Sequence, residues 1–209
     1  MTQTAIRDDL TKTLDHITRI EVTVSRHIGR GNIFSFPDQH KIYEGLFLSA
    51  WTHWEEFIQD LIIYDLATDN KGSVKKEVRG FRTKRAPYRL AERILLHPDH
   101  PQKFVEWDYS SVKARADQFL SPGHRFTNPI SRSGDLEKLK RIRNAIAHKS
   151  DRARNSFLAL VSNFPFNLSP AQRQGITVGR FLAAHRWNGN YVLVESLQCL
   201  RQSALDLVP

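Results

Sequence analysis

Apolar residues recur every three or four positions along the first 62 residues, and this spacing constrains the fold more than any other feature. Two such stripes occur, on either side of the glycine-containing breaker 29–32. They comprise Ile6, Leu10, Leu14, Ile17, Ile20, Val24 and Ile28, and then Ile42, Leu46, Ala50, Trp54, Phe57, Leu61 and Ile62. Residues at this spacing share one face of an α-helix. The sequence therefore predicts two long amphipathic helices, the second reaching about Thr68.

The remainder of the chain also shows mainly helical patterns. Phe34, Phe36 and Pro37 predict a short apolar loop, and Asp38 is expected to cap the second helix. Further elements are expected as helices over 86–97, 111–120, 135–149, 151–163 and 191–207, a capping box at 169–172 and a turn at 188–189. The run 191–194 either begins the last helix or forms a strand of a small hairpin near the C-terminus. The predicted fold is all-α, a single helical domain over residues 1–209 with extra short helices and loops.

One predicted helix end carries side chains suited to phosphate chemistry. The run Arg143–His148, with the sequence RNAIAH, closes the predicted helix 135–149. Arginine offers a permanent planar cation with several donors for phosphate oxygens. Histidine can give and take protons near neutral pH, and asparagine can hold a neighbour in a chosen orientation. The alternative is a solvated helix end, where His148 and Lys149 lie favourably near the negative pole of the helix dipole.

The spacing between arginine and histidine is weak evidence when it stands alone. With 20 arginines and 9 histidines among 209 residues, about one such pair is expected by chance, and a second pair, Arg180 and His185, does occur. Between Arg180 and His185 stand Phe181 and Leu182, bulky apolar residues that are typical of a core. The first pair instead encloses Asn144 and small or aliphatic residues, which let another helix approach closely. Asn144 also precedes His148 by four positions, so both are expected on one helix face.

Two stretches resemble a known family. RNAIAH resembles the Arg-x(4–6)-His signature of HEPN domains in its Arg-Asn-x-x-x-His form. The stretch 48–61, which contains Trp51, Trp54 and Phe57, resembles the early long helix of bacterial HEPN proteins. The resemblance implies an all-α HEPN-like bundle covering most of the chain. The helical spacing of the three aromatic residues predicts that they lie in the core rather than in a surface for stacking bases. Many members of the family are metal-independent ribonucleases of toxin–antitoxin, phage-defence or CRISPR systems, and others only bind nucleotides or partners.

Helix geometry limits how Arg143 and His148 act together. Residues five apart are separated by about 140° around a helix axis and by about 7.5 Å along it, so one regular helix does not present both to one phosphate. Either His148 lies where the helix frays, or a second copy of the chain supplies the complementary half. The HEPN resemblance implies the second solution, a homodimer whose cleft contains two copies of Arg143, Asn144 and His148.

The resemblance also implies a reaction, transesterification within RNA that leaves a 2′,3′-cyclic phosphate. His148 is the expected proton-transfer residue, because histidine titrates near neutral pH. Arg143 is expected to hold the phosphate and to offset its developing charge, and Asn144 to orient His148 or the phosphate. No cofactor and no metal is expected. The nearest metal-like cluster, His97–His100, contains a proline and is typical of a loop.

The charge of the chain favours an anionic partner, for which single-stranded or structured RNA is the expected choice. The formal net charge is +9, and basic surfaces bind nucleic acid through phosphate neutralisation and counterion release. Arg141, Lys149 and Arg152 are the expected RNA contacts near the motif. Residues 71–93, in which nine cations surround two aromatic residues, form a second candidate surface. For all these cations the alternative is an ordinary solvated face.

Cysteine usage and hydropathy favour a cytoplasmic protein. The single cysteine, Cys199, excludes an intrachain disulfide. The first residues lack the layout of a secretory signal, and no apolar run reaches the roughly 18 residues that a bilayer requires. We therefore expect a cytoplasmic endoribonuclease that an antitoxin or another regulatory protein controls. The alternatives are a non-catalytic HEPN-like module that binds RNA, a nucleotide or a protein, and a basic scaffold for an acidic partner protein.

Overall fold

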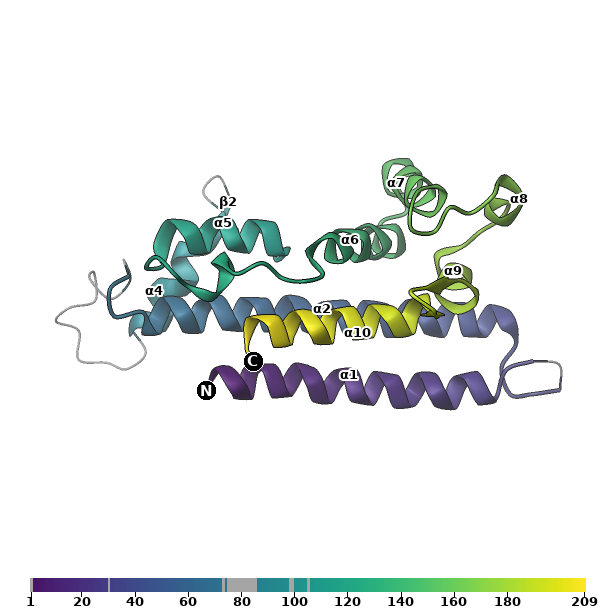
Figure 1. Cartoon of the computed structure of the whole chain (residues 1–209), viewed down its shortest axis with the longest axis horizontal. Helices are drawn as coiled ribbons and strands as arrows, with labels where there is room; N and C mark the ends of the chain where they lie inside the picture. The colour runs from purple at the N-terminus through teal and green to yellow at the C-terminus, as the bar shows by residue number, and fades with distance from the viewer. Residues whose placement is uncertain (1, 30, 73, 75–85, 98–99, 105) are drawn as a thin grey trace. The chain divides into compact units, whose positions relative to one another are not determined.

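A computed structural model describes residues 2–29, 31–72, 74, 86–97, 100–104 and 106–209 (Figure 1). The elements in chain order are α1 (Gln3–Arg26), α2 (Phe36–Thr68), α4 (Ala86–Ile94), β1 (Leu96–His97), β2 (His100–Phe104), α5 (Tyr109–Phe119), the 3-10 helix η1 (Arg125–Thr127), α6 (Ser133–Ala147), α7 (Asp151–Ser162), α8 (Pro170–Arg173), α9 (Val178–Ala184), β3 (Arg186–Trp187), β4 (Asn190–Tyr191) and α10 (Val192–Leu207). The all-α prediction is confirmed. Within these ranges, none of the helices has both the length and the apolar character that crossing a membrane demands.

The chain divides into two compact units. Unit 1 consists of Met1–Asp9, Trp54–Ser131 and Ala204–Pro209, and unit 2 consists of Leu10–His53 and Arg132–Ser203. The candidate residues Arg143, Asn144 and His148 and all of α6 to α9 belong to unit 2. The long helices α1, α2 and α10 contribute residues to both units.

Unit 1 forms around the C-terminal half of α2. Trp54 is fully buried and Phe57 nearly so, which confirms that these aromatic residues belong to the core. The carboxylate of Asp65 accepts a hydrogen bond from Arg125 Nε at 2.7 Å, and Arg125 Nη1 donates to the carbonyl oxygen of Leu207 at 2.8 Å. This arginine thus joins η1 to α2 and to the C-terminal end of α10.

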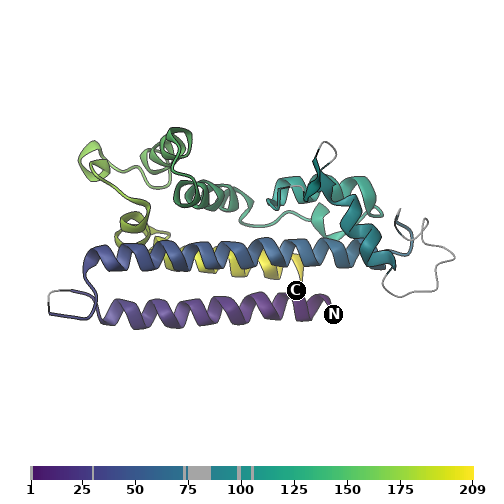
Figure 2. The ribbon, with the colours of Figure 1, turned by 180° about the vertical axis from the view of Figure 1, so that it is seen from behind.

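Unit 2 forms around the helical hairpin of α1 and α2. Most residues of the two predicted stripes are buried, among them Leu14 and Ile17, whereas Ile20, Ile28 and Ile42 are only partly buried. Figures 1 and 2, taken from opposite sides, show α10 running alongside these two helices. An ion pair of 2.6 Å between Arg201 and Asp15 links α10 to α1. The remaining helices of this unit, α6 to α9, carry the candidate site.

The start of α2 differs from the sequence prediction. Phe36 and Pro37 belong to the first helical turn rather than to a loop. The carboxylate of Asp38 accepts hydrogen bonds from the backbone N–H of Ser35 at 2.9 Å and from its hydroxyl at 2.6 Å. Pro37 is tolerated because the first turn has no partner for its missing N–H. The prediction that Asp38 precedes the helix is therefore wrong, and it acts from inside the first turn.

The hairpin of β3 and β4 confirms the predicted C-terminal hairpin. The turn residues Asn188 and Gly189 have φ angles of 49° and 87°, which a tight two-residue hairpin turn requires. Residues 192–194 continue as helix α10, so the strand ends at Tyr191. The predicted capping box is also present, with Ser169 and Gln172 bonded reciprocally at the start of α8. The sequence patterns did not reveal the β1–β2 hairpin or the short helix α9.

Candidate functional site

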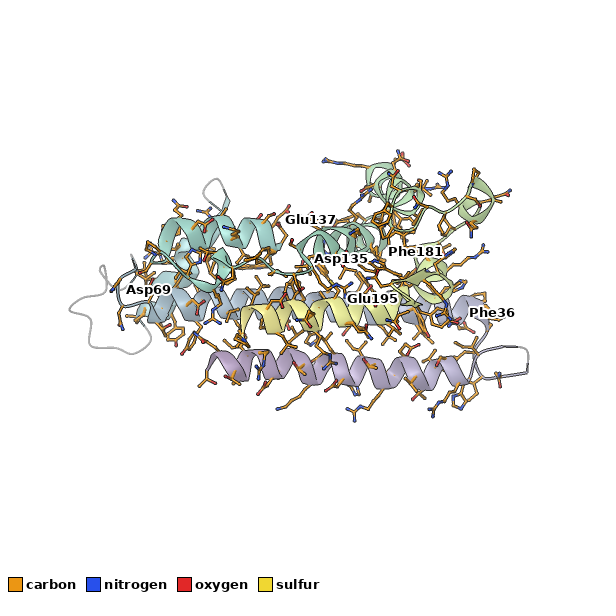
Figure 3. All side chains as sticks on the ribbon, viewed as in Figure 1. Phe36, Asp69, Asp135, Glu137, Phe181 and Glu195 are labelled. Carbon is orange, nitrogen blue, oxygen red and sulfur yellow. The ribbon has the colours of Figure 1, made fainter. Side chains whose placement is uncertain are left out.

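Helix α6 is fixed at its N-terminal end by a charge network. Arg132 donates from Nε to Asp135 at 2.9 Å and from Nη2 to Glu195 on α10 at 2.7 Å. Its guanidinium also lies 5.4 Å from the ring centroid of Trp187, within the range of a cation–π contact. Figure 3 labels Asp135 and Glu195, the two carboxylates that Arg132 joins. The start of α6 is thereby tied to α10 and to the β3–β4 hairpin.

Glu195 is the buried centre of this network, with only 3% of its surface exposed. Burial alone raises the pKa of Glu195, but hydrogen bonds from Asn190, Asn188 and Arg132 hold that pKa below its ordinary value. The two amide donors lie at 2.8 and 3.0 Å. The carboxylate is thus charged and fully engaged, which makes it a rigid anchor rather than a reactive group.

The middle of α6 packs through Leu136, Leu139 and Ile142, all of which are buried. The guanidinium of Arg141 donates from Nε to the hydroxyl of Ser156 at 3.1 Å and from Nη2 to the carbonyl oxygen of the same residue. Arg141 therefore joins α6 to α7. Arg141 is one of the residues predicted to contact RNA, and these two hydrogen bonds occupy two of its N–H donors.

The motif lies where α6 ends. Ala147 is the last helical residue, and His148 is extended, with φ −119° and ψ 116°. Its backbone N–H still donates to the carbonyl oxygen of Asn144 at 2.9 Å. His148 thus lies beyond the regular helix, as the first of the two geometric solutions requires. The side chain of Asn144 accepts a hydrogen bond from Arg143 Nη1 at 3.2 Å, while the exposed imidazole of His148 makes no hydrogen bond to any described residue.

The cations that follow His148 differ from those that precede it. Lys149, Arg152 and Arg154 are exposed, and their side chains have no hydrogen-bond or ion-pair partner among the described residues. Along α6, by contrast, Lys138 pairs with Asp135 at 2.7 Å, and Arg141 is bonded to α7. Unpaired positive charge therefore gathers at the motif end of α6.

His148 lines an open pocket of about 510 Å³ within unit 2. The walls come from the end of α6, the turn into α7, the first turns of α7 and the segment 175–178. The lining residues are Ala145, His148, Lys149, Ser150, Asp151, Arg154, Phe157, Gly175, Ile176, Thr177 and Val178. Arg143 and Asn144 do not line this pocket. Within one chain, His148 and Lys149 therefore line the same pocket, and Arg143 is not among its lining residues.

The segment 175–178 is held in place by contacts of helix α9. The hydroxyl of Thr177 caps α9 by accepting from the backbone N–H of Arg180 at 3.1 Å, and the N–H of Gly179 donates to Glu44 at 2.9 Å. A Cβ at position 179 would lie 2.3 Å from the carbonyl oxygen of His40 on α2. Only glycine permits this approach. The far wall of the pocket is thus built into the fold.

The second arginine–histidine pair lies elsewhere in unit 2. Phe181, which stands between Arg180 and His185, is fully buried, as predicted for a core residue. Partial burial, together with the nearby cation of Arg180, lowers the pKa of His185. Neither Arg180 nor His185 lines the pocket. This pair therefore offers a control for the motif.

The second predicted RNA surface, residues 71–93, falls largely outside the described residues, which omit 73 and 75–85. At its described end, Tyr88 is partly buried and Arg89 is exposed. Across the described parts of the chain, no group of three histidine, cysteine or acidic side chains is placed to hold a metal ion. The run His97–His100, for which the sequence favours a loop over a metal site, lies at the β1–β2 hairpin, and residues 98 and 99 are outside the described residues.

Comparisons with models of protein families, with curated proteins and with solved structures found no match for this chain. The HEPN assignment therefore stays a prediction based on the RNAIAH run and the stretch 48–61. The geometry of the pocket has to carry any functional argument by itself.

The sequence patterns did not single out five residues of the pocket wall, Phe157 and the four residues 175–178. Phe157 carried a core signal, because it lies on the buried stripe of α7. Thr177 carried the signal of a helix cap, since a threonine directly precedes the apolar residues of α9. No local pattern indicates that this cap lines the same pocket as His148, because the two residues lie about 30 positions apart and only tertiary packing places them in one pocket wall.

Proposed function

We propose that this chain is a metal-independent endoribonuclease of the HEPN type. The observation that supports this most is the position of His148, an exposed imidazole without a partner, in a pocket whose rim carries unpaired cations. A general acid or base must reach the proton that it transfers, and an exposed imidazole on a pocket wall can do so.

In the proposed reaction, the ribose 2′-oxygen forms a bond to the adjacent phosphorus while the bond from phosphorus to the 5′-oxygen breaks. One imidazole accepts the proton of the 2′-hydroxyl, and a second donates a proton to the departing 5′-oxygen. The products are a 2′,3′-cyclic phosphate and a 5′-hydroxyl. Arg143 offsets the charge on the pentacoordinate phosphorus, and Asn144 holds the guanidinium of Arg143 through the 3.2 Å hydrogen bond.

The proposed enzyme works as a homodimer. Within one chain Arg143 does not line the pocket that contains His148, and a second copy of the chain can supply the missing guanidinium. Two motif ends meeting across a two-fold axis supply two imidazoles and two guanidinium groups. Lys149 and Arg152, unpaired in the described chain, then contact the RNA backbone on either side. We place the activity in the cytoplasm, in a toxin–antitoxin or antiphage system whose second protein controls it.

The test is cleavage of single-stranded RNA by the purified full chain in EDTA. We expect products with 2′,3′-cyclic phosphate ends. His148→Ala should lower the rate by about 100-fold or more, as typical for loss of a proton-transfer group, while RNA affinity stays within a factor of two or three. His185→Phe, in the matched pair of equal spacing, should cut at the wild-type rate. Cutting that survives His148→Ala would refute the role of His148.

A mixing experiment tests the shared site. Wild-type chain is mixed with a growing fraction of His148→Ala chain under conditions that allow subunits to exchange. If both imidazoles are needed, activity follows the square of the wild-type fraction, because only homodimers of wild-type chains are active. A linear decline would show that each subunit acts alone.

The same geometry favours a second candidate, a non-catalytic module that binds RNA or a nucleotide. In a single chain the pocket joins His148 to Lys149 and Arg154 but excludes Arg143, and that arrangement suits the binding of a phosphate better than its cleavage. A binding module should retain RNA affinity in His148→Ala, release no product, and remain a monomer at the concentrations used for the cleavage assay. The cleavage and mixing assays together decide between the two candidates.

A further inference from the structure

The pocket beside His148 matches the size of one nucleotide. Its volume of about 510 Å³ lies within the range of roughly 300–1,000 Å³ that is usual for small-ligand pockets, and it is too small for several stacked bases. It is open to solvent, so a nucleotide can enter while the neighbouring nucleotides of a strand stay outside. All of its walls belong to unit 2.

One part of the wall suits a phosphate. Lys149 and Arg154 bring cations without partners among the described residues. The hydroxyl oxygens of Ser150 and Thr177 each accept a backbone N–H as helix caps, at 3.2 and 3.1 Å. Each hydroxyl still has a proton to donate, because a hydroxyl has one donor besides its acceptor sites. Two cations and two hydroxyl donors can together bind the anionic oxygens of a phosphate.

Another part of the wall suits a base. Ala145, Phe157, Ile176 and Val178 supply an apolar surface against which a flat ring can pack. Among these basic and apolar groups, Asp151 is the one acidic lining residue, and it has no ion-pair partner among the described residues. Asp151 also lies in the first turn of α7, where a negative charge stabilises the helix. Its free carboxylate oxygens can in addition accept a hydrogen bond from an amino group.

We propose that the pocket binds the single nucleotide next to the cleaved phosphate and that Asp151 selects a base with an exocyclic amino group. The phosphate lies against Lys149 and Arg154, and the base packs against Ile176. A carboxylate accepts from the amino group of cytosine, whereas uracil presents a carbonyl oxygen at the same position and is repelled. This inference concerns the specificity of the site assigned above, and it therefore rests on the proposed ribonuclease function.

The pocket is ready before the nucleotide arrives. The contacts of Gly179 with Glu44 and with His40 fix the far wall, and the turn at Ser150 fixes the near one. A preformed pocket does not spend binding free energy on ordering its walls. Mononucleotides should therefore bind to the full chain without the rest of the RNA.

Calorimetric titration of the full chain with 3′-CMP and 3′-UMP tests the proposal, because these two nucleotides differ chiefly in the amino group at issue. We expect 3′-CMP to bind about tenfold more tightly, the usual size of one hydrogen-bond discrimination. Asp151→Asn, which keeps the size of the side chain, should bring the two affinities within a factor of two or three. Equal affinities in the wild-type chain would overturn the proposed selection.

A second pair of variants tests the location. Ile176→Trp fills the pocket and should weaken both nucleotides by about tenfold or more. Ile33→Trp makes the same change at a residue that is 76% exposed and outside the pocket, and should change neither affinity. If Ile176→Trp destabilises the fold, Thr177→Val, which removes one donor and little volume, should weaken both nucleotides by about fivefold. Unchanged binding in Ile176→Trp and in Thr177→Val would refute the pocket.

The cleavage assay keeps this inference separate from the proposed function. If wild-type chain cuts RNA next to cytidine and Asp151→Asn loses that preference, both stand. If RNA is cut without any base preference and Asp151→Asn changes nothing, the ribonuclease stands and the selection falls. If no RNA is cut but 3′-CMP binds and responds to Asp151→Asn, the ribonuclease falls and the nucleotide pocket remains.

Discussion

The two ends of helix α6 are built in opposite ways. At the N-terminal end, Arg132 is bonded to two carboxylates and lies over Trp187, so that its charge is used within the fold. At the C-terminal end, the side chains of His148 and Lys149 make no hydrogen bond or ion pair with any described residue. One helix therefore combines an anchored end with an end whose polar groups remain available. This division is what a functional site needs, since rigid support holds in place groups that are not themselves engaged.

The cations at and near α6 are of two kinds, those with hydrogen-bond partners in the fold and those without. Judged by charge alone, Arg132 and Arg141 are as suitable for binding RNA as any other cation. Both, however, donate hydrogen bonds to residues of neighbouring elements. Lys149 carries the same sign of charge and no such contact. The number of basic residues near a motif is therefore a weaker guide to nucleic-acid binding than the number of basic side chains without partners.

Removing the guanidinium of Arg132 should give the largest change in the free energy of unfolding. Arg132→Met keeps the length and the apolar part of the side chain but leaves Glu195 buried with only its two amide donors. Breaking one partner of a buried ion pair costs about 3 kcal/mol or more, so we expect a loss of about 3 kcal/mol in the free energy of unfolding. Urea denaturation measures it, with Lys149→Met as the matched control at the other end. A loss below about 1 kcal/mol in Arg132→Met would show that the anchor does not stabilise α6.

A substitution in the turn between α6 and α7 should cause a smaller loss of unfolding free energy. Ser150 caps α7, and Ser150→Ala leaves the N–H of Ala153 without its side-chain acceptor. Loss of such a cap costs about 1 kcal/mol. Amide hydrogen exchange in the first turn of α7 should speed up by a matching factor, while exchange at the start of α6 stays unchanged. Equal acceleration at both places would mean that the two ends of α6 are not independent.

The contrast between the two ends also explains what the sequence reveals. Local sequence patterns predict the helix 135–149, and α6 covers Ser133–Ala147, so both of its ends are predicted within two residues. The partner of Arg132 could not be predicted, because Glu195 lies 63 positions away and only tertiary packing brings them together. The same holds for Thr177, whose place in the pocket depends on the contact between Gly179 and α2. Local rules place the motif, whereas long-range packing decides which of its cations stay unpaired.

The half-buried histidines of unit 2 predict a modest sensitivity to acid. Partial burial and the nearby cation of Arg180 lower the pKa of His40 and of His185 from the ordinary value of 6.5. Below pH 6.5 the unfolded chain therefore binds more protons than the folded chain, and stability falls as the pH falls. We expect His185→Phe and Arg180→Met each to reduce the loss of unfolding free energy between pH 7 and pH 5, measured by urea denaturation. A loss as steep as in the wild-type chain in both variants would contradict this origin.

The smallest effect on stability is expected at the open end, and it carries the most information about function. Lys149 has no partner to lose, so Lys149→Met should change the unfolding free energy by less than about 0.5 kcal/mol. If Lys149 contacts an RNA phosphate, the slope of log affinity against log salt concentration should become shallower by about 0.7, the value for one phosphate of a single strand. Arg132→Met, once corrected for the unfolded fraction, should leave that slope unchanged. The reverse pattern would mean that the anchored end binds the RNA, and the division of α6 into a support and a site would then be wrong.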